Sequence, residues 1–310
     1  MAELVFLDDV NRDENTVLTV GTFDGVHKGH QALINTVVQK AKEQKARSMI
    51  VTFDPHPREI LNPGDSGIKL LTTLEERCRR MEAHGVDVML VIPFDRDFSL
   101  KSSTEFIEHI IHQKIGVKEF VIGYDHHFGK DREGSIKTVE KLGKELNFST
   151  YLVSKKEVAD ITVSSTKIRN ILQEEGDVTK ASKLLGWNYT LSGIVEHGQG
   201  RGKKIGFPTA NLRPLKNNKA IPKVGVYAVK IMIDDRQWDG MMNIGFRPTF
   251  KDNVKKSLEV HIFDFNKKIY GKNITVEFVK RMRGETTFKN SKELIKQLEK
   301  DKKIAQNILK

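Results

Sequence analysis

Short apolar runs alternate with longer, charged amphipathic segments between residues 17 and 153, and this rhythm constrains the fold more than any other feature. The apolar runs are TVLTV, SMIVTF, VDVMLVIPF, KEFVIG and STYLV. Strands that are apolar on both faces are typical of a parallel sheet covered by helices on both sides. The sequence therefore predicts an α/β fold with a doubly wound parallel sheet, whose ligands bind beyond the carboxyl ends of the strands.

The pattern changes beyond Trp187, where strand signals follow one another without long helices between them. These signals are NYTLSGIVEH, GVYAVKIMID, QWDGMMNIG, KSLEVHIFDF and NITVEFVKRM, and they predict a small antiparallel β-barrel. We expect a final helix from about Asn290, because Glu293 supports this cap position three residues later. A chain of 310 residues exceeds the usual size of one hydrophobic core, so we predict two domains, 1–185 and 186–310.

Composition excludes several classes of protein. The run VMLVIPF is far too short to span a membrane, and the N-terminus carries acids where a secretory signal carries lysines, so we expect a reducing, cytoplasmic location. The single cysteine, Cys78, excludes an internal disulfide and a cysteine-rich zinc site. The net charge of +11 suits polyphosphate substrates, a membrane surface or nucleic acid, but the basic residues are interleaved with acids rather than gathered in one patch.

The stretch GTFDGVHKGH directly follows the first apolar run and places two histidines, His27 and His30, three residues apart. If a helix begins near His27, both imidazoles lie on nearly the same face of its first turn. The free amides and the positive end of the helix dipole favour anions there, and the glycines at 21, 25 and 29 let a bulky ligand approach the backbone. The alternative is a pair of surface histidines in a helix-start turn.

Long motifs identify the family that this chain resembles. GTFDGVHKGH resembles the HxGH signature of nucleotidylyltransferases, in the form found in bacterial bifunctional riboflavin kinase/FAD synthetases, whose second activity is FMN adenylyltransferase. Six further stretches resemble the same family in the same order, from about residue 16 to residue 285. They are TFDPHP, GYDHHFG, TVSSTKIR, GRGKKIGFPTANL, NIGFRPTF and LEVHIFDF.

The resemblance implies that the N-terminal domain transfers AMP from ATP to the phosphate of FMN, giving FAD and pyrophosphate. His27, His30 and Arg169 are then catalytic, and Asp125 and Phe128 lie on the flavin side, where His126 departs from the expected aromatic residue. The residues implied to bind ATP here are Gly21, Phe23, Gly25, Ser164, Ser165 and Thr166. Without the first motif, Ser164 would be no more than a helix N-cap.

The stretch GQGRGKKIGFPTAN fits neither a Walker-type loop nor a dinucleotide fingerprint, and its proline forbids a continuing helix. We interpret it as a glycine-rich flap that leads into a barrel strand, where Thr209 and Asn211 project to the same side. The resemblance implies that these two residues hold Mg²⁺ together with ATP phosphates; alternatively they are ordinary polar strand residues. The flap residues implied to bind ATP are Gly200, Arg201, Gly202, Lys203 and Gly206.

Glu259 lies on a largely aromatic strand face, where a carboxylate is costly unless it is paired or has a function. The resemblance implies that Glu259 is the general base that takes the proton of the riboflavin 5′-hydroxyl, and that Asn243 and Phe263 contact the flavin; a rim salt bridge is the alternative for Glu259. The expected function is a bifunctional transferase that makes FMN and then FAD with ATP and Mg²⁺, as a monomer or weak homo-oligomer without nucleic acid or membrane. The alternatives are an FAD synthetase with an inactive barrel, or an RNA-binding protein with a HIGH-like motif.

Overall fold

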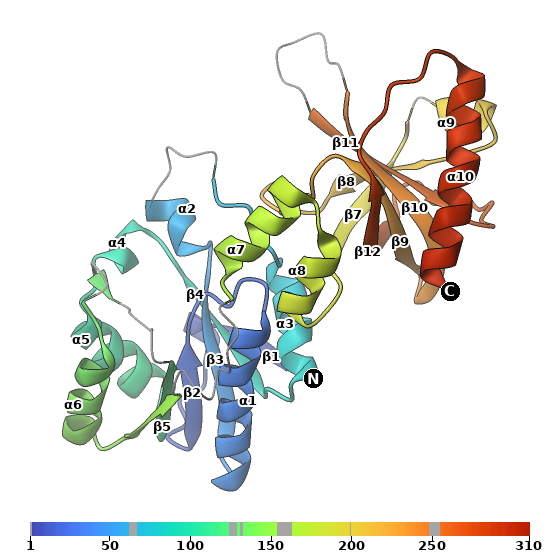
Figure 1. Cartoon of the computed structure of the whole chain (residues 1–310). Coiled ribbons are helices and arrows are strands. Elements are labelled where there is room, and N and C mark those ends of the chain that lie inside the picture. The colour runs from blue at the N-terminus through green and yellow to red at the C-terminus, as the bar shows by residue number, and fades with distance from the viewer. Residues whose placement is uncertain are drawn as a thin grey trace. The chain divides into compact units, whose positions relative to one another are not determined.

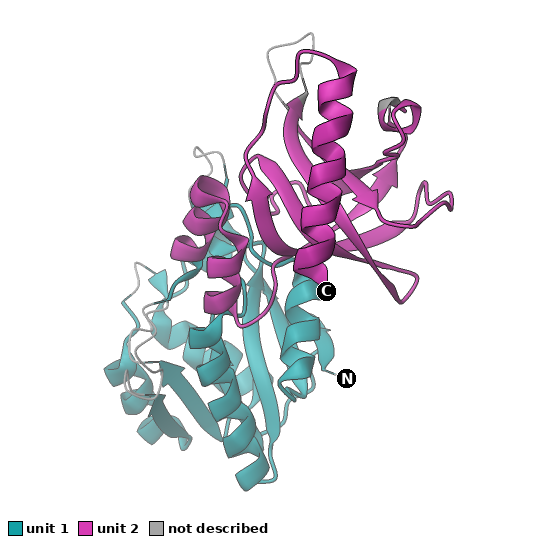
Figure 2. Ribbon diagram, turned by 45° about the vertical axis from the view of Figure 1, so that its right-hand side comes forward, with its two compact units in different colours: residues 1–165 teal, residues 166–310 magenta. Residues whose placement is uncertain are grey.

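The computed structural model describes residues 2–61, 67–123, 129–130, 133–153, 163–198, 200–247 and 255–310, without the side chains of residues 201, 247 and 255. The chain forms two compact units, residues 1–165 and 166–310 (Figure 2). Each unit is built around its own sheet, so the two-part organisation predicted from the sequence is present.

The first unit contains a six-stranded parallel sheet with the order β1-β4-β3-β2-β5-β6 (Figure 1). Its strands are β1 (Glu3–Phe6), β2 (Thr16–Val20), β3 (Arg47–Asp54), β4 (Val88–Pro93), β5 (Glu119–Gly123) and β6 (Ser149–Val153). The strand order reverses between β2 and β5, because β3 and β4 lie on one side of β2 while β5 and β6 lie on the other. Ligands of open α/β sheets bind at such a reversal, so the loop that follows β2 occupies the expected place.

Helices cover both faces of this sheet, which confirms the doubly wound α/β prediction. On one face, Leu18, Met49 and Leu90 pack against the segments η2 and α6. On the other face, Val17, Ile50 and Met89 pack against α1 and α3. The strands are apolar throughout because both faces of the sheet are buried. The helical segments are η1 (Leu7–Asp9), α1 (Lys28–Glu43), α2 (Pro57–Leu61), α3 (Leu74–Ala83), α4 (Arg96–Ser99), α5 (Ser103–Glu105), the π-helical η2 (Phe106–Ile115) and α6 (Ile136–Leu146).

The second unit begins with the helical segments α7 (Ser165–Asn170), η4 (Ile171–Glu175) and α8 (Val178–Leu185); the first residue of α7, Ser165, still belongs to the first unit. The chain then forms a closed antiparallel barrel with the strand order β10-β11-β8-β7-β12-β9. The predicted barrel is therefore confirmed. Its remaining elements are β7 (Thr190–Glu196), α9 (Arg201–Lys204), β8 (Ala210–Pro214), β9 (Gly225–Ile233), β10 (Arg236–Arg247), β11 (Lys255–Ile262), β12 (Asn273–Arg283) and α10 (Ser291–Leu309). Helix α10 has Asn290 as its N-cap, as predicted, and packs Ala305 and Leu309 against the barrel side chains Met241 and Phe263.

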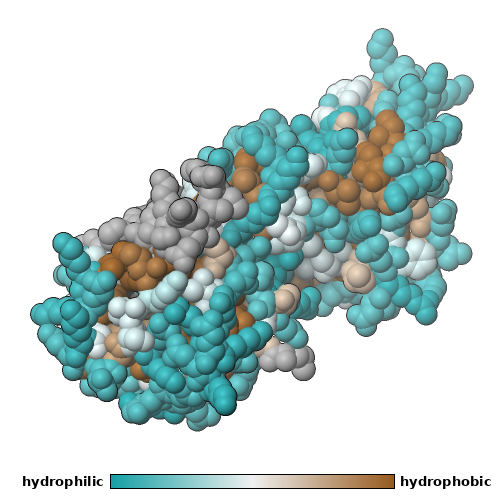
Figure 3. All heavy atoms as spheres, turned by 60° about the horizontal axis from the view of Figure 1, so that its bottom comes forward, coloured by the Kyte–Doolittle hydropathy of each residue, from teal (hydrophilic) through white to brown (hydrophobic). Residues whose placement is uncertain are grey.

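The surface is mainly hydrophilic on the face drawn in Figure 3, and the hydrophobic patches there are small and separate. No helix among the described residues has the length and apolar character needed to cross a membrane.

Candidate active sites

The loop between β2 and α1 holds a strained conformation. Phe23 and Val26 have positive φ angles of 47° and 37°, which residues with a Cβ atom rarely adopt. The buried carboxylate of Asp24 anchors the loop by accepting hydrogen bonds from the backbone N–H groups of Leu71 and Thr72, at 2.9 and 3.0 Å. Strain of this kind persists only where the surroundings over-determine the backbone, and it is common at functional sites.

Two imidazole rings stack at the start of α1. His27 is the N-cap, and its Nδ1 atom accepts a hydrogen bond from the backbone N–H of His30 at 3.3 Å. The ring centroids of His27 and His30 lie 3.5 Å apart, and the edge of Phe23 packs against His30. Both histidines therefore lie on one face of the first turn, as predicted. Because His27 accepts through Nδ1, the hydrogen bond assigns its proton to Nε2 in the neutral form, which makes Nε2 a donor.

His30 is a neutral imidazole near pH 7. Burial, the neighbouring His27 and the guanidinium of Arg77 hold the pKa of His30 well below its usual value. The Nδ1 atom of His30 is buried and has no hydrogen-bond partner within the described part of the chain. Buried polar atoms are normally satisfied, so this unsatisfied nitrogen is an exception among buried groups.

A buried arginine supports the same loop. The side chain of Arg77 is 1% exposed, and its Nη1 atom donates a hydrogen bond to the hydroxyl of Thr52 at 2.9 Å. That hydroxyl in turn donates to the carbonyl oxygen of Thr22 at 3.2 Å, so Arg77 is linked to the loop after β2. Sequence reasoning missed Arg77, because an arginine in the charged run LEERCRR is expected to face solvent.

The segment SSTKIR contacts this loop through the hydroxyl of Ser165. The Oγ atom of Ser165 donates a hydrogen bond to the carbonyl oxygen of Asp24 at 2.8 Å, which joins the start of α7 to the loop after β2. Ser164 is exposed one residue earlier. Thr166 and Arg169 belong to the second unit, where a guanidinium N–H of Arg169 donates to the Thr166 hydroxyl at 3.4 Å. The ATP contacts expected for these four residues stay predictions.

Two glycines of the first motif make room for the motif's own rings. A Cβ atom on Gly21 would lie 3.0 Å from the ring of Phe23, and one on Gly29 would lie 3.3 Å from the ring of His27. Gly25 has a φ angle of 87°, which glycine adopts without cost. The close approach of ATP expected at Gly21 and Gly25 stays a prediction. The predicted flavin residues Asp125 and Phe128 lie outside the described residues.

The second unit places three predicted side chains in one row across three strands. Asn211 on β8 pairs directly with Glu259 on β11, and Glu259 pairs directly with Asn243 on β10. Directly paired residues of antiparallel strands project to the same face, with Cβ atoms about 4.5 to 5.5 Å apart. The hydroxyl of Thr209 also donates to the carboxylate of Glu259, at 3.4 Å. Residues that are 32 positions apart in the sequence, Asn211 and Asn243, thus flank one carboxylate.

The glycine-rich flap presses against the same row. The amide nitrogen of Asn211 lies against Gly198, where any Cβ atom would collide with it, and a Cβ on Gly202 would lie 3.4 Å from the Thr209 hydroxyl. Gly200 and Gly206 have φ angles of 67° and 83°, and among the described residues no atom would lie within 4 Å of a Cβ at either position. Sequence reasoning missed Gly198, since this contact joins it to a residue 13 positions away.

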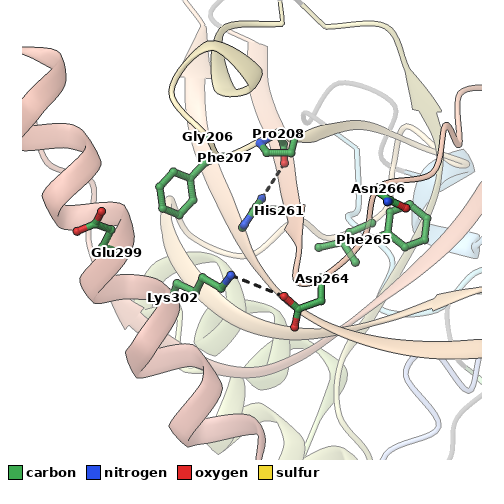
Figure 4. A pocket seen from close by; sticks show the side chains of 10 residues that line it. Gly206, Phe207, Pro208, His261, Asp264, Phe265, Asn266, Glu299 and Lys302 are labelled. Carbon is green, nitrogen blue, oxygen red and sulfur yellow. Dashed lines mark hydrogen bonds and ion pairs between the residues drawn. The ribbon is translucent and has the colours of Figure 1, made fainter.

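A pocket of about 620 Å³ adjoins the end of this flap (Figure 4). His261 forms its wall, and the Nδ1 atom of His261 lies 2.8 Å from the carbonyl oxygen of Pro208. On the other side, the ammonium group of Lys302 on α10 lies 3.9 Å from the carboxylate of Asp264. Phe263 is only 4% exposed and packs against α10, so its predicted flavin contact stays a prediction.

Family models match both parts of the chain. A model described as FAD synthetase matches residues 9–167, and a model described as riboflavin kinase matches residues 185–309. Curated proteins named bifunctional riboflavin kinase/FMN adenylyltransferase are 40% identical over most of the chain: that of Listeria monocytogenes over 93% of this chain and 91% of its own length, and that of Bacillus subtilis over 94% and 91%. The chain belongs to the bifunctional riboflavin kinase/FMN adenylyltransferase family.

In this chain, the first family match contains the stacked histidines and the second contains the row at Glu259. The resemblance stated from the motifs is confirmed. A solved structure from Streptococcus pneumoniae, described as a macrolide-efflux protein, is 32% identical, with a TM-score of 0.86, and covers 98% of this chain and 99% of that one. The two family matches leave residues 168–184 between them, and the predicted domain boundary at 185/186 stays a prediction.

Proposed function

We propose that the two units divide the family's reactions between them, with the catalytic groups that the sequence motifs indicate. The chain is a transferase that phosphorylates riboflavin to FMN and adenylylates FMN to FAD, with ATP as the second substrate of both reactions. In this proposal the second unit forms FMN and the first unit forms FAD. The single observation that carries the proposal is the row of Asn211, Glu259 and Asn243 beside Thr209, in a unit separate from the stacked His27 and His30.

Adenylyl transfer needs positioned donors rather than a covalent intermediate. The phosphate of FMN attacks the α-phosphorus of ATP, and pyrophosphate leaves with the electrons of the broken P–O bond. The Nε2–H of His27 and the neutral ring of His30 donate hydrogen bonds to phosphate oxygens as charge develops on them. Ser165, which belongs to the first unit and whose hydroxyl donates to the carbonyl oxygen of Asp24, offers a further polar group for the pyrophosphate. A neutral His30 suits this role, because its donor capacity does not change across the physiological pH range.

Riboflavin phosphorylation needs a base and a charge-neutralising ion. The carboxylate of Glu259 takes the proton of the riboflavin 5′-hydroxyl while that oxygen attacks the γ-phosphorus, and ADP leaves. Thr209 and Asn211 present a hydroxyl and an amide beside this carboxylate, and hard oxygen donors of this kind fit Mg²⁺. Bound Mg²⁺ would neutralise charge on the ATP phosphates. The flap glycines leave space for those phosphates close to the backbone.

Finer points of the sequence interpretation belong to the same proposal. We propose that the metal is Mg²⁺, that the chain works as a monomer or weak homo-oligomer without nucleic acid, and that it acts in the cytoplasm. The interleaving of basic and acidic residues supports substrate binding over nucleic-acid binding, and the single cysteine fits a reducing compartment.

A time course tests the proposal. The purified protein is incubated with riboflavin, ATP and Mg²⁺, and the flavins are separated by chromatography at intervals. We expect FMN to rise first and FAD to follow. Formation of FAD from added FMN without any formation of FMN from riboflavin would support the alternative of an inactive barrel and would contradict the proposal for the second unit.

A further inference from the structure

Glu285, a carboxylate outside the sequence motifs, lies beside Asn243 of the polar row described above. Gly245 lies on β10, two residues after Asn243, and therefore on the same face of the strand. A Cβ atom on Gly245 would lie 2.5 Å from Oε1 of Glu285 and 3.2 Å from Nδ2 of Asn243. The carboxylate of Glu285 thus fills the space that a side chain at position 245 would occupy, next to the amide of Asn243.

The loop that carries Glu285 is held firmly. Arg283, at the end of β12, donates hydrogen bonds from Nε and Nη2 to the carboxylate of Asp301 on α10, at 3.1 and 2.7 Å. Asp301 is 1% exposed and also accepts a hydrogen bond from Gln297. The Nη1 atom of Arg283 donates to the carbonyl oxygen of Gly284 at 2.9 Å, which fixes the residue before Glu285. A bidentate pair with a buried carboxylate gives the loop a defined geometry.

Glu285 itself is exposed and makes no hydrogen bond or ion pair within the described residues. We propose that Glu285, together with Asn243, binds the ribityl hydroxyl groups of riboflavin at the kinase site. The inference rests on the proposed function of the second unit. A carboxylate accepts hydrogen bonds and does not donate them when ionised, so it selects a ligand that presents hydroxyl or N–H donors.

The spacing between Glu259 and Glu285 favours the ribityl chain, rather than the flavin ring, as the part of riboflavin that Glu285 contacts. The 5′-hydroxyl must reach Glu259, whose direct neighbour on β10 is Asn243. Gly245 lies roughly 6.7 Å further along that strand, and Glu285 contacts this position. The other hydroxyls of the ribityl chain lie on the carbons next to the 5′-carbon, so they come within reach of Asn243 and Glu285 when the 5′-hydroxyl is at Glu259.

Steady-state kinetics of Glu285→Ala test the inference. We expect the KM for riboflavin in FMN formation to rise at least tenfold, because a hydrogen bond to a charged group is lost, while kcat stays within about threefold and the KM for ATP within about twofold. Glu174→Ala is the matched control, since Glu174 is an exposed glutamate of the same unit, on η4. An unchanged riboflavin KM, or a fall in kcat at unchanged KM, contradicts the inference.

Two further measurements separate the possible causes of a raised KM for riboflavin in Glu285→Ala. Fluorescence titration with lumiflavin, which lacks the ribityl chain, should give the same affinity for wild type and Glu285→Ala; an equal loss for riboflavin and lumiflavin would place Glu285 at the ring and overturn the inference. Gly245→Ala should displace the carboxylate and raise the riboflavin KM, but should add less than about twofold in the Glu285→Ala background; a full additive effect contradicts the inference. If wild type forms no FMN, the proposed function of this unit has failed instead.

Discussion

Replacing Gly198 by alanine should damage one activity and spare the other. A Cβ atom at position 198 would collide with the amide nitrogen of Asn211, so the side chain of Asn211 must move by about an ångström or more to reach van der Waals contact. A displacement of 1 Å in a catalytic site costs about 100-fold in rate. We therefore expect kcat/KM for riboflavin phosphorylation to fall about 100-fold, while FAD formation from FMN stays within about twofold of wild type.

The fold should tolerate this substitution. Gly198 does not adopt a left-handed backbone conformation, so alanine is allowed there, and the strain falls on the far end of one side chain. Overpacking of this kind costs about 1 to 3 kcal/mol, offset by less than about 1 kcal/mol from the lower entropy of the unfolded chain. Thermal unfolding of the purified variant checks this point.

A coupled assay of ADP release measures the kinase activity, and chromatography measures FAD in the same preparation. The control is the double variant Gly198→Ala/Asn211→Ala, which should be no slower than Asn211→Ala alone, because both changes remove the same positioned amide. Wild-type kinase activity in Gly198→Ala, or equal loss of both activities in a folded protein, would refute the reasoning.

Other substitutions and conditions test the remaining steps. His30→Ala should slow FAD formation by about 100- to 1,000-fold, the effect of losing one preorganised donor, while FMN formation survives; equal loss of both in the folded variant would reject the assignment. Glu259→Gln should lower kinase turnover by about 100-fold or more, and turnover within about threefold of wild type would show that another group is the base. Removal of Mg²⁺ with a chelator should abolish FMN formation, and added Mg²⁺ should restore it; activity without a divalent ion would contradict the metal role of Thr209 and Asn211. The pKa of His30 is lowered in the folded chain, so the unfolded chain binds a proton that the folded chain does not, and the free energy of unfolding should fall as the pH drops below about 6.5. Calorimetry at several pH values should show a weaker fall for His30→Ala than for wild type. An identical fall in both proteins would contradict the assigned environment of His30.

The fold could be predicted because its signals are local. Apolar runs such as TVLTV and SMIVTF are buried on both faces of one sheet, and burial on both faces is visible in the sequence as an uninterrupted run. The barrel followed from closely spaced strand signals, and the start of α10 from the pair Asn290 and Glu293. The stacking of His27 on His30 followed from helical spacing, which brings residues three apart onto one face.

Contacts between distant segments could not be predicted in the same way. Asp24 is held by backbone groups 47 and 48 residues away, and Arg77 on helix α3 reaches Thr52 on strand β3. Glu285 lies beside Gly245 only because β12 ends at the same end of the barrel as β10. Nothing local distinguishes a glutamate after a strand from any other solvated acid, so these residues become visible only when the strands are paired in space.

The central claim is that the two reactions occur at separate sites, so that each can be blocked alone. The most direct measurement mixes His30→Ala with Glu259→Gln and follows riboflavin in the presence of ATP and Mg²⁺. We predict that His30→Ala alone stops at FMN, that Glu259→Gln alone leaves riboflavin unconverted, and that the mixture forms FAD, because FMN released by one variant is used by the other. A mixture of folded variants that still forms no FAD, or a single variant that loses both reactions, would contradict the account.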